Sequence, residues 1–561
     1  MTTPANPVLF FHPDGFRASR ADLKGRHSAG ESFLSAYLDQ TAHPDVYALC
    51  GRQEEFHEFE AIVKDCERPL QAKHVGRNDI AVLRQQGLLH LPHPQVAEEA
   101  RVRSFHGETA YAICGVTHTI SSRAIIDAIA DLATAPAMPW DAVILTSRAV
   151  EKAVSVILGN AEDYLRRRTG AAKFTRPMLP VIPLGTHVNR FQRKDSDRGR
   201  WRSKLQLADD TIAVLFFGRL SFHAKASPFQ LAQAVEMAAA EGKQRYAIIW
   251  CGWFNDDFQQ SVFMDTAKQM APSVEFHHVD GRAAETRFSI WSAADIFCSL
   301  SDNIQETFGL TIIEAMAAGL PVIASNWDGY RDTIKNGITG ILVDTYFPEV
   351  SLADVANRHI SGVDSYDQFI GAASQFCAVD VTQTARWIAR LGQDGDWRRK
   401  LAAAARQAAE SEFDWKVILP RYQDLWRAQL EALERARRNN APNSLFWKGF
   451  DPAAIFASYP SHRLDGRARL ARGPHFAHWD DLVKEKGIAI NQAVLMNRTE
   501  FYAIRDRFAA DEVLQAGHLL AGLAAERQPI VLRSLYWLVK IGLLRIASSD
   551  GGDAAGPPKN T

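Results

Sequence analysis

The sequence predicts an α/β protein built from two doubly wound domains and a mainly helical C-terminal extension. Short β-rich runs alternate with helical stretches over about the first 400 residues, a pattern typical of parallel sheets with helices on both faces. A charged stretch interrupts this alternation, and a second series of apolar runs begins after it. At 561 residues the chain also exceeds what one ordinary core can hold.

The predicted strands fall into two series. The first series covers residues 8–11, 46–50, 110–114 and 142–146. The second series covers residues 212–217, 246–251, 274–277, 295–300, 321–324 and 340–343. Between them, residues 189–200 are rich in charge, and we interpret them as an interdomain linker. The Asp-Ser-Asp triplet at 195–197 formally matches a metal motif, but it lies within this charge run and does not close an apolar strand.

Composition is that of a soluble globular protein, with 47% apolar and 23% charged residues. Lys and Arg number 64 and Asp and Glu 65, so the net charge gives no general affinity for nucleic acid or an anionic membrane. The six cysteines are scattered without metal or redox spacing, which predicts reduced thiols in a cytoplasmic protein. Apolar runs fall far short of the roughly 18 residues of a membrane span, so any membrane contact would be peripheral.

The segment 305–324 carries the most information about function. Glu306 and Glu314 stand eight positions apart on either side of a Phe-Gly turn. If 294–300 is a buried strand and 311–318 a helix, backbone N–H groups at the helix N-terminus form an anion site. The residues expected there are Phe308, Gly309, Leu310 and Thr311. A ligand with a phosphate on these amides would meet a carboxylate at each end, as a nucleotide-sugar does.

This spacing resembles the Glu-x7-Glu signature of the retaining family 4 glycosyltransferases. The resemblance continues through 314–324, 328–332 and 336–343, which makes a chance pairing of two acids the weaker interpretation. It implies two facing Rossmann-like domains, the GT-B architecture. It also implies transfer of a hexose from a nucleotide-diphosphate sugar to a glycan, lipid-linked or small-molecule acceptor, without a metal or a cofactor.

Two cations are expected to bind the diphosphate of the donor. Arg219 and Lys225 follow the predicted strand 212–217, where ligands bind in open α/β sheets. Without a metal, charge on the departing diphosphate has to be met by Arg, Lys and helix amides. The family's Gly-Arg-x4-Lys segment resembles 218–225, although 222–226 departs from the usual sequence. The alternative is that both are solvated surface cations.

The resemblance also assigns roles to single residues. Glu306 would lie near the reacting carbon of the donor sugar as a catalytic residue, and Glu314 would bind the ribose hydroxyls. Asp280 follows a strand and would lie beside the base, with main-chain contacts. His118 follows the predicted strand 110–114 and would face the cleft as a second catalytic candidate. Gly30, in a Gly-rich loop and helix start at 25–33, would approach the diphosphate, with Ser28 as a weaker candidate.

Other site classes find little support. No carboxylate or cysteine completes a metal-ligand set with His90, His93, His277 and His278 at suitable spacing, so no metal is expected. The chain has neither a Gly-x-Gly-x-x-Gly after a strand nor a Walker loop, which disfavours a dehydrogenase or an ATPase. A sugar-nucleotide epimerase, a phosphorylase of the same architecture and a non-catalytic scaffold remain as alternatives.

The resemblance sets the expected domain boundaries. These are a first, acceptor-side domain over 1–190, a linker over 191–210, a nucleotide-sugar domain over 211–411, crossover helices over 412–440, a helical extension over 441–547 and a disordered tail over 548–561. Residues 345–376 look like an insertion. In the extension, 528–546 reads as an amphipathic helix rimmed by Arg533, Lys540 and Arg545, typical of internal packing, with a winged-helix element, a protein partner or a membrane surface as alternatives.

Overall fold

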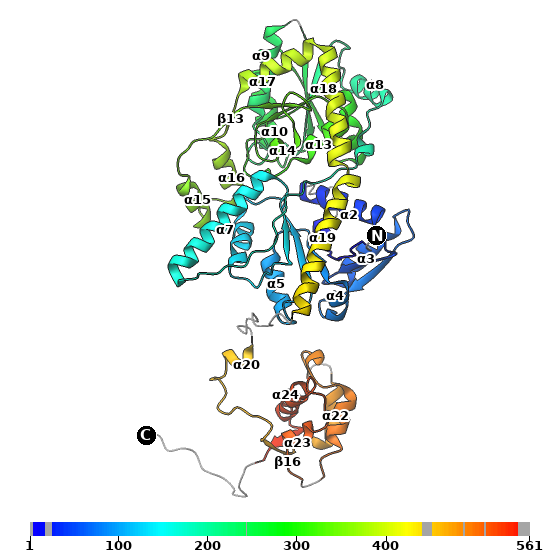
Figure 1. Ribbon diagram of the computed structural model, residues 1–561, viewed down its shortest axis with the longest axis vertical. Coiled ribbons are helices and arrows are strands. Elements are labelled where there is room, and N and C mark those ends of the chain that lie inside the picture. Colours follow the sequence, from blue (N-terminus) through cyan, green and yellow to red (C-terminus); the bar gives the residue numbers. More distant parts are fainter. Residues whose placement is uncertain are drawn as a thin grey trace. The chain divides into compact units, whose positions relative to one another are not determined.

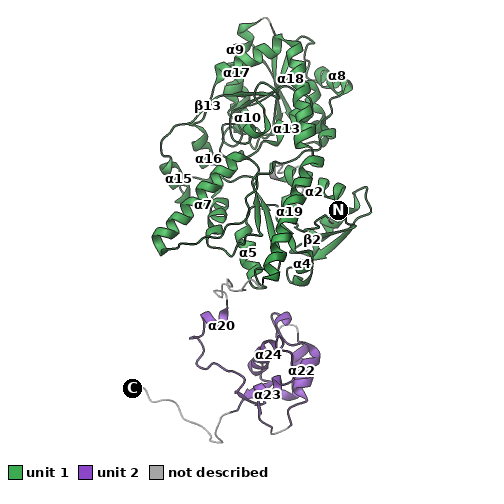
Figure 2. Ribbon diagram, in the orientation of Figure 1, with its two compact units in different colours: residues 1–447 green, residues 448–561 purple. Residues whose placement is uncertain are grey.

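The computed structural model describes residues 4–16, 25–242, 244–439, 451–485, 489–509 and 512–547. The chain divides into two compact units, residues 1–447 and 448–561 (Figure 2). The expected boundary at 440 and the tail over 548–561 lie outside the described residues.

The first half of unit 1 is a six-stranded parallel sheet in the order β3-β2-β1-β4-β5-β6. Its strands are β1 (Val8–Phe10), β2 (Asp45–Leu49), β3 (Gln71–Val75), β4 (Leu88–His90), β5 (Ala112–Val116) and β6 (Ala142–Ile144). Its helices are α1 (Pro13–Phe16), α2 (Gly25–Gln40), α3 (Gln53–Lys64), α4 (Ile80–Gln86), α5 (Val96–Ser104), α6 (Arg123–Ala130) and α7 (Arg148–Thr169). The sequence analysis located four of these strands and missed β3 and β4.

The second half is another six-stranded parallel sheet, in the order β12-β11-β10-β7-β8-β9. Its strands are β7 (Ile212–Phe217), β8 (Tyr246–Gly252), β9 (Glu275–Asp280), β10 (Ile296–Ser299), β11 (Val322–Ser325) and β12 (Ile341–Val343). Its helices include α9 (Pro228–Glu241), α10 (Asp257–Ser261), α11 (Ala267–Met270), α12 (Ala284–Ser289), α13 (Leu310–Ala317), α14 (Tyr330–Thr333), α17 (Val381–Gln393) and α18 (Gly395–Ala408). The predicted fold class, with its two doubly wound sheets, is confirmed.

Helix α19 (Trp415–Arg438) returns from the second half to the first. It contacts α2, β4 and β5, and Figure 1 shows it, in yellow, along the blue elements of the first half. Trp415, Tyr422 and Trp426 are buried in the core of the first half. The side-chain amide of Gln429 donates 2.9 Å hydrogen bonds to the carbonyls of Ile113 and Trp140, which ties α19 to the first sheet.

Within the stretch expected as the linker, 191–210, residues Asp195–Lys204 form helix α8. Trp201 is buried, and its indole N–H donates to Ser289 Oγ over 2.9 Å. Asp295 accepts hydrogen bonds from Arg198 at 2.8 Å and Arg202 at 3.3 Å, so the charged run packs against the second half by ion pairing. Asp197 forms an ion pair with Arg200 of the same helix at 3.0 Å.

The insertion at 345–376 has structure of its own. Strand β13 (Thr345–Tyr346) pairs antiparallel with β14 (Ala378–Val379), and between them lie α15 (Ala353–Ile360) and α16 (Tyr366–Ser374). Figure 1 shows both helices at one side of unit 1.

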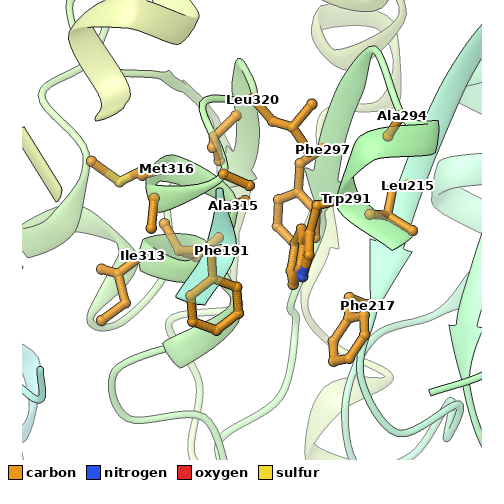
Figure 3. Packing of buried hydrophobic residues seen from close by; sticks show 14 of the residues in the cluster. Phe191, Leu215, Phe217, Trp291, Ala294, Phe297, Ile313, Ala315, Met316 and Leu320 are labelled. Carbon is orange, nitrogen blue, oxygen red and sulfur yellow. The ribbon is translucent and has the colours of Figure 1, made fainter. Parts of the chain in front are cut away.

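Helix α13 sits on a large apolar core, part of which is drawn in Figure 3. Ile313 and Met316 of α13 belong to this core, as do Phe217 of β7, Phe297 of β10 and Trp291, which precedes β10. The rings of Phe217 and Trp291 stack with centroids 5.0 Å apart. Because such cores are close-packed, α13 and the loop before it are held in a fixed position.

Unit 2 has helices around a three-stranded sheet, in the order β16-β15-β17. Its elements include α20 (Pro452–Ile455), β15 (Arg469–Arg472), α21 (Trp479–Lys484), α22 (Arg498–Arg505), β16 (Leu514–Gln515), α23 (Ala516–Leu520), α24 (Gln528–Lys540) and β17 (Leu544–Ile546). The helix predicted over 528–546 ends at Lys540, since Gly542 makes a left-handed turn into β17. The apolar face of α24, with Val531, Leu535 and Leu538, packs into this unit's own core. Among the described residues no helix is both long and apolar enough to cross a membrane.

Candidate functional site

The site is built on the loop between β10 and α13. Gly309 caps α13 with a left-handed φ of 87°, and a Cβ at this position would lie 2.0 Å from the ring of Tyr330. A Cβ on Gly329 would lie 2.6 Å from the carbonyl oxygen of Thr307. Only glycine allows these close approaches. The N–H groups of Leu310 and Thr311 open α13 and have no carbonyl one turn earlier in the helix, as the anion site requires.

Glu306 and Lys225 form an ion pair in this loop region. Lys225 Nζ donates to Glu306 Oε2 over 2.6 Å, and only 10% of the Glu306 side chain is exposed. Burial pushes the pKa of Glu306 upward, but the charge and hydrogen bond of Lys225 outweigh burial and hold that pKa below its usual range. The Thr307 N–H contributes a long hydrogen bond of 3.4 Å to the same carboxylate. The structure thus pairs Glu306, the predicted catalytic acid, with Lys225, a cation predicted to bind the diphosphate.

Arg219 belongs to a hydrogen-bonded chain that links both halves of unit 1. Its guanidinium donates to Gln305 Oε1 over 3.0 Å, and Gln305 Nε2 donates to Tyr366 Oη over 3.0 Å. Tyr366 Oη in turn shares a 2.7 Å hydrogen bond with Ser121 Oγ of the first half. Sequence reasoning missed Gln305, Tyr366 and Ser121. The adjacency of Gln305 to Glu306 was an available clue, whereas nothing in the sequence relates Tyr366 to Arg219.

Glu314 lies on α13, facing a small cavity. Its residue is 6% exposed, and burial raises its pKa although Arg287 and Lys225 oppose the rise. Leu310 and the weaker candidate Ser28 line the same cavity. Lys225 therefore acts electrostatically on both acids of the Glu-x7-Glu pair, which have opposite pKa shifts because only Glu306 has a direct cationic partner.

His118 and Gly30 line a second small cavity, in the first half. The carbonyl of His118 accepts a hydrogen bond from the hydroxyl of Thr307, so the strand end carrying His118 touches the site loop. A Cβ on Gly30 would lie 1.8 Å from the carbonyl oxygen of Gly15, which gives this glycine a packing role between α2 and α1.

Asp280 and Phe308 occupy different environments. Asp280 ends β9, is exposed, and pairs with Arg282 at 2.6 Å. The side chain of Phe308 is buried in the core under α13, so only its backbone is free to contact a ligand.

Asp328 lies close enough to Glu306 to sense its charge, and sequence reasoning did not single it out. It has a left-handed φ of 44°, unusual for a residue other than glycine, and Ser147 Oγ of the first half donates to its Oδ1 over 3.4 Å. Its other oxygen, Oδ2, has no hydrogen-bond partner among the described residues. Burial and the charge of Glu306 raise the pKa of Asp328 to about 8. A carboxyl that holds a proton near neutral pH therefore lies close to an ionised one.

The histidines that suggested a metal differ in setting. Burial lowers the pKa of His90 to about 3 and that of His93 to about 4, so both rings are neutral at ordinary pH. His277 and His278 lie on β9. No group of three or more His, Cys, Asp or Glu side chains in the described ranges is arranged to hold a metal ion.

Comparison with known proteins found a family model that matches part of the second half of unit 1. Residues 197–376 match the family model described as Glycosyl transferases group 1. The chain is 29% identical over 221 residues to D-inositol 3-phosphate glycosyltransferase of Corynebacterium kroppenstedtii, covering 37% of this chain and 48% of the relative. It is 28% identical over 189 residues to the protein of the same name from Rhodococcus jostii, covering 33% and 40%. The chain thus spans less than half the length of these relatives.

Two solved structures share a more distant likeness. HepE of Anabaena, in complex with UDP-glucose, has 17% identity and a TM-score of 0.47, covering 76% of this chain and 99% of that one. A glycosyltransferase from Rickettsia africae has 14% identity and a TM-score of 0.48, with coverage of 76% and 99%. Arg219, Lys225, Glu306 and Glu314 all lie within the residues that match the glycosyl transferases group 1 model.

Proposed function

We propose that this protein is a retaining glycosyltransferase of family 4, which moves a hexose from a nucleotide-diphosphate sugar to a glycan, lipid-linked or small-molecule acceptor without a metal. The observation that carries this proposal is the 2.6 Å pair of Lys225 and Glu306 beside the N-terminus of α13, inside the matched domain. It combines an anion site with an ionised carboxylate, as a nucleotide-sugar requires.

Transfer breaks the bond between the anomeric carbon and the β-phosphate oxygen, and forms a bond from that carbon to an acceptor oxygen on the same face. The departing phosphate oxygen takes the acceptor's proton. Charge grows on the diphosphate during this step, and Arg219, Lys225 and the amides of Leu310 and Thr311 would stabilise it. The core under α13 holds the helix amides, and contacts with Gln305 and Glu306 hold Arg219 and Lys225, so little reorganisation is needed when the charge appears.

The two acids would have separate tasks. Glu314 would accept hydrogen bonds from the ribose hydroxyls, and Glu306 would position the donor sugar near its reacting carbon. Asp328, protonated up to a pH of about 8, would donate a hydrogen bond to a sugar hydroxyl or to the acceptor. His118 and Gly30 would serve the acceptor side and the diphosphate, and Asp280 and Phe308 would contribute backbone contacts near the base and the phosphates.

The matched relatives are named for inositol 3-phosphate, but the family match lies in the donor half of this chain. We therefore leave the acceptor open and expect the first half to select it. A cytoplasmic location fits six free cysteines, five of them buried. Peripheral contact with a membrane or a protein partner through unit 2 is a further expectation, which co-sedimentation with lipid vesicles would test.

A screen of UDP-, GDP- and ADP-sugars by thermal shift tests the proposal first. Donor at a hundred times its dissociation constant should stabilise the fold by roughly 2.7 kcal/mol. Product formed with a mixed glycan acceptor pool is then analysed by NMR for its anomeric configuration, and inversion would contradict the retaining assignment. Conversion of donor to an isomer or free sugar without acceptor would favour an epimerase. Absence of any nucleotide-sugar binding would favour a scaffold.

A further inference from the structure

A cavity of about 740 Å³ lies outside the candidate donor site, bounded by α9, α10 and α16. Its volume is within the roughly 300–1,000 Å³ range of small-molecule sites. One wall is α16 from the insertion at 345–376, so this cavity exists because of a segment that the sequence analysis singled out as additional.

The cavity is separated from the donor site by the loop after β7. On one side of this loop Lys225 contacts Glu306. On the other side Phe222, His223 and Ser227 line the cavity, whereas Lys225 and Glu306 do not. The Asn303 side chain donates to the His223 carbonyl and fixes the loop between the two spaces.

Three acceptor oxygens in the cavity lining lack donors. Asp302 is 3% exposed; its Oδ2 accepts from Gln230 Nε2 over 3.2 Å, while its Oδ1 has no partner among the described residues. Gln259 is 5% exposed, and its amide nitrogen donates to Asp256 over 3.0 Å. Across the described chain, nothing donates to Gln259 Oε1 or to Gln230 Oε1. All three oxygens are covered in this structure, and buried acceptors without donors are costly, so a small side-chain adjustment that opened them to the cavity would let a ligand with O–H or N–H groups supply the missing donors.

The charge of the lining excludes anionic ligands. Carboxylates of Asp256, Asp302 and Asp367 line the cavity, and no Lys or Arg among the described residues does. Burial lowers the pKa of His223, although Asp367 opposes the shift, so the histidine adds no lasting positive charge at neutral pH. A phosphate or a nucleotide would meet uncompensated repulsion here.

The remaining walls favour a ring over a compact cation. Phe222, Phe229 and Phe258 present apolar surface to the cavity, and the C–H face of a pyranose can pack on such rings while its hydroxyls donate to the oxygens. Burial raises the pKa of Asp302 to about 7, so at neutral pH this carboxyl is only partly ionised, and Asp256 and Asp367 are the lining side chains that could pair with an amine.

We propose that this cavity is a second binding site, which takes a neutral saccharide unit through the Asp302, Gln230 and Gln259 oxygens and the phenylalanine walls. The site is distinct from the donor site and stands on its own contacts. It would hold part of a glycan acceptor or product if the proposed transfer is correct.

The test uses the full chain and ligand-observed NMR with maltose, cellobiose and lactose, alongside glucose 6-phosphate and spermidine. At least one neutral disaccharide should bind, with a dissociation constant below roughly 10 mM, and the phosphate ester should not. Ala372→Trp fills the cavity from α16 and should weaken binding at least about tenfold, the loss expected when contacts worth one or two hydrogen bonds are blocked. Ala353→Trp makes the same change on α15, away from the lining, and should bind as wild type does.

Asp302→Asn gives a second variant of nearly equal size, whose thermal unfolding is measured to check that it folds. It should weaken disaccharide binding in the same way. Lys225→Ala separates this site from the donor site, because it should reduce nucleoside diphosphate binding and leave disaccharide binding unchanged. The proposal is overturned if no neutral disaccharide binds, if spermidine alone binds, or if binding survives Ala372→Trp.

Discussion

Replacing Glu306 by Gln separates the two roles that the Lys225 pair suggests. The structure gives Glu306 a 2.6 Å charge-assisted hydrogen bond at a side chain only 10% exposed. Such a bond contributes about 1.5–3 kcal/mol. Because the glutamine still accepts a hydrogen bond from Lys225 and keeps the shape of the side chain, we expect a loss of stability of about 1–2 kcal/mol and a folded protein.

Nucleoside diphosphate binding should behave differently from turnover in this variant. In the wild type, Lys225 is already neutralised by Glu306, and the diphosphate has to compete with that carboxylate. Glu306→Gln releases the ammonium, so affinity for the nucleoside diphosphate should stay the same or increase. Transfer should fall by roughly two orders of magnitude, the scale of losing one positioned transition-state contact.

Calorimetric titration of nucleoside diphosphate and initial rates over a range of donor concentrations measure the two effects. Glu349→Gln is a matched control, since Glu349 is exposed on the insertion and lies outside the site. Combining Glu306→Gln with Lys225→Met in a double-mutant cycle gives the coupling energy of the pair. Wild-type turnover in Glu306→Gln, or loss of nucleotide affinity, would refute the reasoning.

Four further outcomes are expected. Glu314→Gln should raise the donor KM more than it lowers kcat, because ribose contacts are common to ground and transition states; an effect on kcat alone would contradict this role. Treatment with a chelator should leave transfer largely intact, and complete loss that a divalent ion restores would show a metal requirement. Tyr366→Phe removes the hydroxyl that holds Gln305 and should weaken donor binding by about 0.5–1.5 kcal/mol, whereas Tyr459→Phe, at an exposed position, serves as the control. Equal donor affinities of the two variants in calorimetric titration would contradict this role of Tyr366. Burial holds the pKa of His90 at about 3, so below pH 6.5 this histidine binds fewer protons in the folded than in the unfolded protein, and its contribution to stability falls as pH falls. His90→Gln should therefore reduce the slope of unfolding free energy against pH by up to about 1.4 kcal/mol per pH unit between pH 4 and 6. An unchanged slope would contradict the assignment.

The second sheet was predictable because β7, β8, β10 and β11 are buried along their whole length and appear as continuous apolar runs, such as Ile212–Phe217. The two missed strands of the first sheet have other patterns. Gln71–Val75 is an edge strand with exposed polar side chains, and Leu88–His90 has only three residues, too few for a periodic pattern. Tertiary pairing, not local sequence, makes these segments strands.

In the candidate site too, local sequence predicts some residues, and only tertiary packing brings the others together. Glu306, Lys225 and the N-terminus of α13 follow from motif spacing, because strand ends and a helix start bring them together locally. Tyr366 and Ser121 are 245 positions apart and meet only when the insertion packs across both halves. The packing of the charged stretch could not be predicted for a related reason, since Arg198 and Arg202 pair with Asp295, a residue far along the chain.

Helix α16 connects the donor site to the proposed saccharide cavity. Tyr366, at its first position, hydrogen-bonds to Gln305 and Ser121, and Gly371 and Ala372, about one and a half turns further on, line the cavity. A short helix moves as a rigid body, so a ligand that shifts α16 also alters the Tyr366 hydrogen bonds and, through Gln305, the position of Arg219. By thermodynamic reciprocity, donor binding then has to change saccharide affinity by the same factor as saccharide changes donor affinity. If both proposed sites are occupied as we infer, the insertion would supply a physical route by which saccharide binding and diphosphate binding influence each other.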